Sequence, residues 1–256
     1  MQSKDKKVNK WSNVDHLIPK AAIQKFFNIF GLQILRKKNT PLYTLLGLKN
    51  MPIRTIIDIG ANRGQFAKSI SNMFPSARLF CFEPLPEPYT ELQKWAKRQK
   101  KGRVSAINAA IGMENREITM MLHEEHTPSS SILPITEKTA ELYPQTRRQK
   151  PIQVQQKTLD DILYNEKLED LILIKMDVQG YEDRVIAGGR HVFLKSHACI
   201  TEISIDMLYQ EQASFPGLID VFANLGYRYG GNIHQAYGPD GHCVFFDALF
   251  IRDISQ

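Results

Sequence analysis

Apolar runs of strand length alternate with helix-like segments over most of the chain. Residues 55–59 form an apolar run that ends at Gly60, and residues 65–74 indicate the helix that follows it. The other predicted strands cover residues 77–82, 104–111, 171–178, 198–205 and 242–251, with an extra strand at 117–124. The other predicted helices cover residues 87–100, 158–164, 181–194 and 216–225. Strands that alternate with helices predict an α/β fold with a mostly parallel sheet and helices on both faces.

Residues 126–151 interrupt this alternation. They contain Pro128, Pro134 and Pro144, together with three consecutive serines at 129–131. Clusters of proline and serine favour loops over regular elements, so we expect a long loop or insertion here. Loops of this length inside a compact domain are often active-site lids.

Residues 1–50 differ from the rest of the chain. Pro19 can begin a helix that runs toward Lys38, flanked by lysines and arginines. Its apolar residues recur at helical spacing: Ile23, Phe26, Phe27, Phe30, Ile34 and Leu35. Two interpretations stay open: a helix that caps the core of the main domain, which is the commoner case, or a basic amphipathic helix on a membrane surface. We expect an N-terminal helical extension over residues 1–50 and one main domain over residues 51–256.

Composition and charge change this picture little. The chain has 256 residues, 43% hydrophobic and 23% charged, as in ordinary globular enzymes. The net charge of +6 is spread over separate clusters, which favours solvated faces over a nucleic-acid footprint. Cys81, Cys199 and Cys243 show no zinc-binding spacing and indicate a reducing compartment. We find no signal peptide and no apolar run long enough to span a membrane. We therefore expect a cytoplasmic protein, peripheral to the inner membrane face if the N-terminal helix is of the second kind.

The segment 58–64, Asp-Ile-Gly-Ala-Asn-Arg-Gly, carries the strongest chemical signal. Gly60 allows a sharp turn without a Cβ clash, and Gly64 allows the next helix to start in close packing. Such a turn lets a ligand press against the main chain at the end of a parallel sheet. The phosphate-loop motif GxxxxGK[ST] is absent, and Asn62 stands where the dinucleotide motif GxGxxG has its second glycine. A smaller adenosyl ligand without phosphates fits this turn better.

Glu83 ends the second predicted strand and is followed at once by Pro84, which fixes the carboxylate at the edge of the sheet. An acidic side chain about 20 residues after a glycine turn can accept hydrogen bonds from both hydroxyls of a ribose. A solvated carboxylate at a strand end is the plain alternative. The preceding glycine turn makes the ribose role the better prediction.

A second strand, glycine turn and helix occur over residues 173–182. Asp177 is expected at the carboxyl end of a central strand, in the crevice where open α/β sheets bind ligands. Lys175 lies two residues earlier and shares the same face of the sheet. A lysine inside a strand needs a partner or a route to solvent. A structural pair of Lys175 and Asp177 therefore stays open beside a role for Asp177 in the chemistry.

Together these motifs resemble the FkbM family of methyltransferases over about residues 52–252. The resemblance lies mainly in residues 58–66 and 174–182. Shorter segments support it in the family's order: Phe82-Glu83-Pro84, Asn108-Ala-Ala-Ile-Gly112, Ser129-Ser-Ser131, Thr158-Leu-Asp-Asp161, Thr201-Glu202 and Asp247-Ala-Leu-Phe250. Gln179 departs from the pattern, because many members carry glutamate there, so a role that needs a charge at this position does not carry over.

The resemblance implies a Rossmann-like class I methyltransferase fold with a seven-stranded sheet. It also implies S-adenosylmethionine as the cofactor and O-methylation of a hydroxyl on a sugar, glycan or natural product. It places the glycine turn around the methionine part of the cofactor, Glu83 on the ribose, and residues 108–110 beside the adenine or the centre of the cofactor. The expected cofactor-binding residues are Asp58, Gly60, Ala61, Asn62, Gly64, Phe66, Glu83, Pro84, Asn108, Ala109, Ala110, Asp177, Val178 and Gln179.

Methylation of an alcohol calls for a base, because an alcohol is a poor nucleophile. A base that takes the hydroxyl proton speeds such a reaction about 10²- to 10⁴-fold. Asp177 is the first candidate, and Glu182 and Glu202 are the second. Three carboxylates in one crevice also suit a divalent cation such as magnesium, and the sequence leaves this open. The plain alternatives are that Glu182 caps its helix and that Glu202 accepts backbone hydrogen bonds.

Three other functions stay open at this point. A nucleic-acid methyltransferase is favoured by the positive charge, but the chain has neither an Asp/Asn-Pro-Pro-aromatic element nor a Pro-Cys pair. An NAD(P)-dependent oxidoreductase requires the GxGxxG turn that the chain lacks. A non-catalytic binding module would keep the glycine turn only as scaffold.

Overall fold

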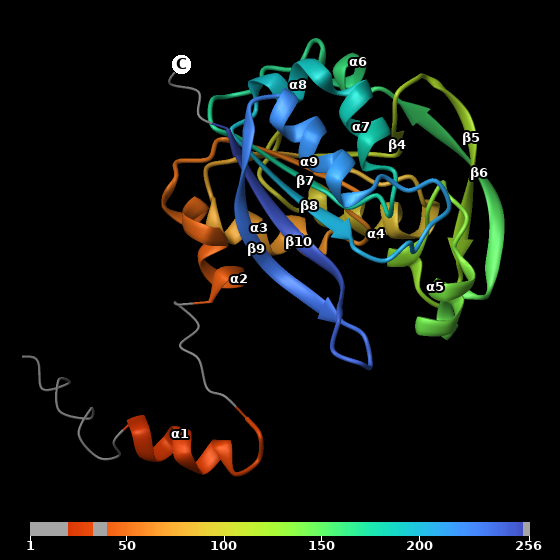
Figure 1. Cartoon of the computed structure of the whole chain (residues 1–256). Coiled ribbons are helices and arrows are strands. Elements are labelled where there is room, and N and C mark those ends of the chain that lie inside the picture. The colour runs from red at the N-terminus through yellow and green to blue at the C-terminus, as the bar shows by residue number, and fades with distance from the viewer. Residues whose placement is uncertain (1–19, 33–39, 253–256) are drawn as a thin grey trace, which may run out of the picture.

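A seven-stranded sheet forms the centre of the molecule in the computed structural model, which describes residues 20–32 and 40–252 (Figure 1). Its strands, in spatial order, are β3 (Val104–Ile107), β2 (Arg78–Phe82), β1 (Thr55–Ile59), β7 (Ile172–Met176), β8 (Ala198–Ser204), β10 (Cys243–Arg252) and β9 (Tyr227–Tyr237). Neighbouring strands from β3 to β8 are parallel, whereas β10 runs antiparallel to both β8 and β9. The predicted mostly parallel, Rossmann-like sheet is confirmed.

Helices cover both faces of this sheet because strand residues alternate between two apolar layers. In β1, Ile57 and Ile59 pack into one core and Ile56 into the other. The first core joins the sheet to α6 (Leu159–Leu163), α7 (Glu182–Gly188), α8 (Arg190–Lys195) and α9 (Phe215–Asn224). The second joins it to α3 (Gln65–Met73), α4 (Pro86–Lys97) and the 3₁₀ helix η2 (Leu45–Asn50). Figure 1 shows these two helical layers above and below the sheet.

A smaller sheet lies at the end of the first and has the order β4-β6-β5 (Figure 1). Its strands are β4 (Ala110–Ile111), β6 (Gln149–Lys157) and β5 (Arg116–His123). The prediction of one strand over 104–111 is therefore wrong, because the chain leaves the main sheet after Ile107 and pairs with β6 from Ala110. The extra strand predicted at 117–124 is confirmed as β5.

The segment 126–151 is more regular than the predicted loop. It contains the 3₁₀ helices η3 (Thr127–Ser129) and η4 (Pro144–Thr146), the helix α5 (Glu137–Leu142) and the start of β6. The hydroxyl of Thr136 accepts a hydrogen bond from Thr139 N and caps α5. β6 pairs with the whole of β5, which is a partner distant in sequence. Such pairing leaves little local signal, which is why this strand was not predicted.

Two further elements differ from the prediction. The helix expected over 181–194 is broken into α7 and α8 at Gly188 and Gly189. A Cβ atom at Gly188 would lie 1.9 Å from the carbonyl oxygen of Gly112, so the chain needs glycine where it passes this turn. β9 was not predicted, because Gly230 and Gly231 interrupt its alternation and its register with β10 shifts.

The N-terminal region contributes α1 (Lys20–Asn28) and α2 (Pro41–Thr44). The predicted helix begins as expected, but its continuation over residues 33–38 lies outside the described residues. Phe26, Ile29 and Phe30 are 57%, 78% and 64% exposed, so they do not take part in the core as a capping helix would require. None of the described helices has the length and apolar character needed to cross a membrane.

Candidate active site

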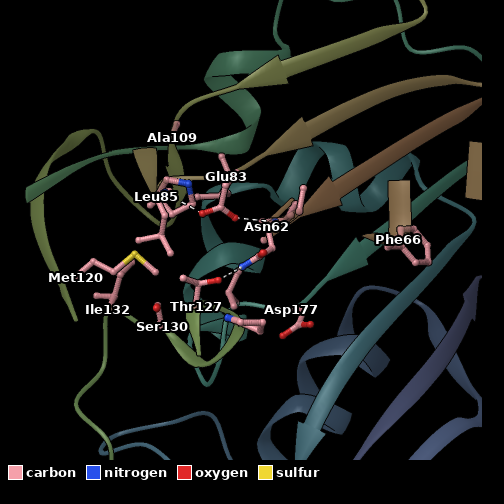
Figure 2. A pocket seen from close by; sticks show the side chains of 18 of the residues that line it. Asn62, Phe66, Glu83, Leu85, Ala109, Met120, Thr127, Ser130, Ile132 and Asp177 are labelled. Atoms are coloured by element: carbon pink, nitrogen blue, oxygen red, sulfur yellow. Dashed lines mark hydrogen bonds between the residues drawn. The ribbon is translucent and has the colours of Figure 1, made fainter. Parts of the chain in front are cut away.

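A cavity of about 320 Å³, here called the first cavity, opens at the carboxyl ends of β1, β2 and β7 (Figure 2). Ten of the expected cofactor-binding residues line it: Gly60, Ala61, Asn62, Phe66, Glu83, Pro84, Ala109, Ala110, Asp177 and Val178. The residues that sequence reasoning did not place there are Ile59, Gln65, Leu85, Ile111, Met120, Thr127, Pro128, Ser130, Ile132 and Lys175. The cavity lies where open parallel sheets bind their ligands.

The turn after β1 forms one side of the first cavity. Gly60 has φ +79°, and its N–H and that of Ala61 both donate to the carbonyl oxygen of Phe82 at the end of β2. A Cβ atom at Gly60 would lie 2.0 Å from the carbonyl oxygen of Asp177, so this turn packs directly on the one after β7. Gly64 has φ +82° and starts α3, but it faces Leu92 rather than the cavity.

Glu83 is fixed to the same turn by its carboxylate. Its Oε2 accepts a hydrogen bond of 2.7 Å from Asn62 N, and its Oε1 accepts one of 2.8 Å from Leu85 N. Burial raises the pKa of Glu83 to about 7, although the two backbone N–H groups favour the charged form. Asn108, which is exposed, supports this loop from outside by donating to the carbonyl oxygens of Glu83 and Pro84. Both carboxylate oxygens keep a lone pair for a ligand.

The opposite wall of the first cavity comes from the smaller sheet and the segment that follows it. Met120 and Ile132 lie at one end of the cavity and Asp177 at the other (Figure 2). Asn62 Nδ2 donates to Thr127 Oγ1 at 3.3 Å and so links the glycine turn to this wall. These residues carry no local motif, because they reach the cavity only through the pairing of distant strands.

The turn after β7 gathers several charged and polar groups. Asp177 Oδ2 accepts a hydrogen bond of 3.1 Å from Lys175 Nζ, and Asp177 Oδ1 accepts one of 2.6 Å from Gln179 Nε2. Gln179 Nε2 also donates to Glu202 Oε1 at 3.1 Å. Burial lowers the pKa of Lys175, but the negative charges of Asp177 and Asp58 outweigh it, so the pKa lies above its usual value and the lysine is charged. The predicted pair of Lys175 and Asp177 is therefore present within a larger network.

Glu202 lies at the far end of that network. Burial, together with the charges of Asp177 and Glu182, raises the pKa of Glu202 well above its usual value. Its partner in the structure is the Gln179 amide rather than the backbone hydrogen bonds considered as the plain alternative. Glu202 is thus close to the first-choice base and is held by a side chain that touches both.

Two expected site residues lie outside the cavities. Glu182 Oε1 accepts hydrogen bonds from the N–H groups of Val178 and Gly180, at 3.4 and 3.2 Å, and burial raises its pKa to about 7. Its carboxylate therefore stabilises the turn at the start of α7, and this position argues against a role as base. Asp58 is fully buried, neither of its oxygens has a hydrogen-bond partner among the described residues, and burial raises its pKa to about 6 despite Lys175.

The carboxylates considered for a divalent cation do not converge. The amide of Gln179 stands between Asp177 and Glu202, and the backbone engages Glu182. In residues 20–32 and 40–252, no group of three or more His, Cys, Asp or Glu side chains is arranged to hold a metal ion.

A second cavity, also of about 320 Å³, adjoins the first. Its lining includes Tyr143, Asp177, Gln179, Glu202, Tyr209 and Phe245. Asp177 and Pro128 line both cavities, so the two spaces meet at the end of β7. Gln179, expected among the cofactor-binding residues, belongs to the second cavity rather than to the first.

Comparison with known proteins gives a consistent result. The family model described as the methyltransferase FkbM domain matches residues 58–229. The chain is 33% identical over 186 residues to the 2-O-methyltransferase NoeI of Sinorhizobium fredii, which covers 69% of this chain and 74% of that protein. It is 27% identical over 146 residues to Methyltransferase 1 of Beauveria bassiana, covering 52% of this chain and 57% of that protein.

Among solved structures, a methyltransferase FkbM from Methylobacillus flagellatus superposes with a TM-score of 0.46 at 15% identity, covering 78% of this chain and 44% of that one. The family model and the first relative each span about two thirds of the chain and include both glycine turns. The chain therefore belongs to the FkbM family of S-adenosylmethionine-dependent methyltransferases.

Proposed function

We propose that the protein transfers a methyl group from S-adenosylmethionine to a hydroxyl oxygen of a sugar, glycan or natural-product acceptor. One observation carries the proposal: Asp177 lies where a cavity suited to an adenosyl ligand meets a second, polar cavity. A carboxylate at such a junction can reach both the cofactor and an acceptor. The name of the similar 2-O-methyltransferase supports a hydroxyl as the acceptor group.

The first cavity fits the cofactor in its chemistry. Glu83 offers two carboxylate oxygens to the ribose hydroxyls, and Leu85, Met120 and Ile132 offer apolar walls to a purine. The main chain of the glycine turn remains for the methionine part. Sites of this kind are mostly apolar with a few polar groups that fix orientation, and the first cavity has that character.

The chemistry asked of the chain is modest. S-adenosylmethionine supplies an activated methyl group on a sulfonium. The chain has to hold an acceptor hydroxyl in line with that group and to remove its proton. Lys175 and Gln179 fix both oxygens of Asp177. We assign Asp177 as the base, which takes up the hydroxyl proton as the oxygen is methylated.

The proposal is tested with purified full-length protein. Mass spectrometry for co-bound adenosyl compounds and calorimetry with S-adenosylmethionine test the cofactor. Transfer of a radiolabelled methyl group to a panel of hydroxylated glycans and natural products tests the reaction. We expect tight cofactor binding and alkali-stable methyl incorporation, as an ether gives. Absence of cofactor binding, or methylation confined to nitrogen or carboxylate groups, would contradict the proposal.

A further inference from the structure

The second cavity is built from elements far apart in sequence. Tyr143 comes from the segment between α5 and η4, Glu202 from β8, Phe245 from β10, and Gln179 from the turn after β7. Its volume of about 320 Å³ falls in the range of small-molecule sites. Because it meets the first cavity at Asp177, a molecule inside it has atoms within reach of the proposed base.

The polar groups of this cavity are arranged to receive hydroxyl hydrogens. A single nitrogen, Gln179 Nε2, donates to Asp177 and to Glu202, so the two carboxylates lie on either side of it. The carbonyl oxygen of Gln179 lies 2.7 Å from the Tyr209 hydroxyl, which fixes the amide in this orientation. The amide is thus fully used, while each carboxylate keeps an oxygen or lone pair for a donor. Two neighbouring hydroxyls on one ring would match two neighbouring carboxylates.

Aromatic side chains supply the remaining surface. Tyr143, Tyr209 and Phe245 all line the cavity. Burial and the charges of Glu202 and Asp206 raise the pKa of Tyr143, which places its hydroxyl in the field of the same carboxylates. Tyrosine pairs a large apolar face with a polar tip, so these walls suit a ring that has C–H faces and hydroxyl edges.

The charge of the cavity is one-sided. Of the described residues that line it, none is lysine or arginine, whereas Asp177 and Glu202 both are carboxylates. The nearest cations are otherwise engaged: Lys175 pairs with Asp177, and Lys138 pairs with Asp206 at 2.8 Å. A phosphate or carboxylate on the acceptor would meet like charges without a counter-ion, which disfavours it.

We propose that the second cavity is the acceptor site and that it selects an uncharged, polyhydroxylated ring over a phosphorylated or carboxylated one. The inference rests on the proposed function. In it, Glu202 and Gln179 are specificity residues that orient neighbouring hydroxyls, and Tyr143 and Phe245 contact the ring. Asp177 takes the proton of the hydroxyl that is methylated.

The test compares acceptors and variants in the full-length protein. The probes are neutral methyl glycosides and oligosaccharides, and the corresponding uronic acids and sugar phosphates, each with radiolabelled S-adenosylmethionine. We expect kcat/KM for neutral glycosides to exceed that for their anionic counterparts at least about 10-fold. Glu202→Gln should narrow this preference, because it removes one of the two repelling charges.

A pair of tyrosine variants separates contact from general damage. Tyr143→Ala should raise the acceptor KM about 10-fold with an unchanged Kd for S-adenosylmethionine. Tyr164→Ala, at a residue that is 84% exposed and outside both cavities, should change neither. Equal or better use of anionic acceptors, no methylation of any glycoside by cofactor-bound protein, or an unchanged acceptor KM in Tyr143→Ala would overturn the inference alone. Loss of cofactor binding in the unmodified protein would overturn the proposed function as well.

Discussion

Strands β1 and β7 are parallel neighbours, and each ends in a turn whose third residue has a left-handed backbone: Asn62 with φ +47° and Gln179 with φ +55°. In the first turn, the main chain of Asn62 binds Glu83. In the second, the side chain of Gln179 binds Asp177 and Glu202. Residues held in this backbone region cost of order 1 kcal/mol or more each and cluster at functional sites. One backbone shape thus carries two chemistries, an adenosyl grip and a carboxylate cluster.

The contact between the turns offers the most damaging way to break this arrangement. Gly60→Ala should lower the free energy of unfolding by more than about 3 kcal/mol, because the new Cβ would lie 2.0 Å from the carbonyl oxygen of Asp177. Gly102→Ala is a matched control: its φ is +78°, and nothing lies within 4 Å of its Cβ position. It should show only the backbone strain of about 1–2 kcal/mol. Urea unfolding of both variants makes the comparison, and equal losses would refute the close contact.

The second turn is tested by its central carboxylate. Asp177→Asn should reduce turnover about 10²- to 10⁴-fold, since an amide cannot take up the hydroxyl proton. Single-turnover methyl transfer with saturating cofactor measures the effect. Full activity of this variant would remove Asp177 from the chemistry and leave the pair with Lys175 as a structural feature.

The first turn is tested through Glu83. Glu83→Gln should weaken S-adenosylmethionine binding by about 10- to 100-fold, because hydrogen bonds to a charged group contribute roughly 1.5–3 kcal/mol. Glu117→Gln, an exposed carboxylate on β5, serves as the control. Calorimetry that finds the same Kd in both variants would show that Glu83 is not the ribose ligand.

The smallest expected effect is on the pH dependence of stability. Burial raises the folded-state pKa of Glu182 to about 7, above its ordinary value of 4.5. The folded protein then binds more protons than the unfolded chain between these values, so stability should fall as pH rises from about 5 to about 8. Glu182→Gln cannot titrate, and its melting temperature should fall less over this window. Parallel curves for the two proteins would show that Glu182 titrates normally.

The sequence predicts the parts of the molecule that depend on short motifs. The strand and turn at residues 55–64, the position of Glu83 and the position of Asp177 follow from local spacing. The wall of Met120 and Ile132 does not, because it depends on the pairing of β5 and β6 across a long connection. The bridge from Gln179 to Glu202 was also missed, since side-chain contacts between different strands leave no pattern along the chain.

The central claim is a division of labour between the two turns, and one crossed measurement tests it most directly. Cofactor Kd and turnover at saturating cofactor are measured for Glu83→Gln and Asp177→Asn. We predict that the first variant changes mainly Kd and the second mainly turnover. If each variant changed both quantities to the same extent, the two turns would not act separately and the account would be contradicted.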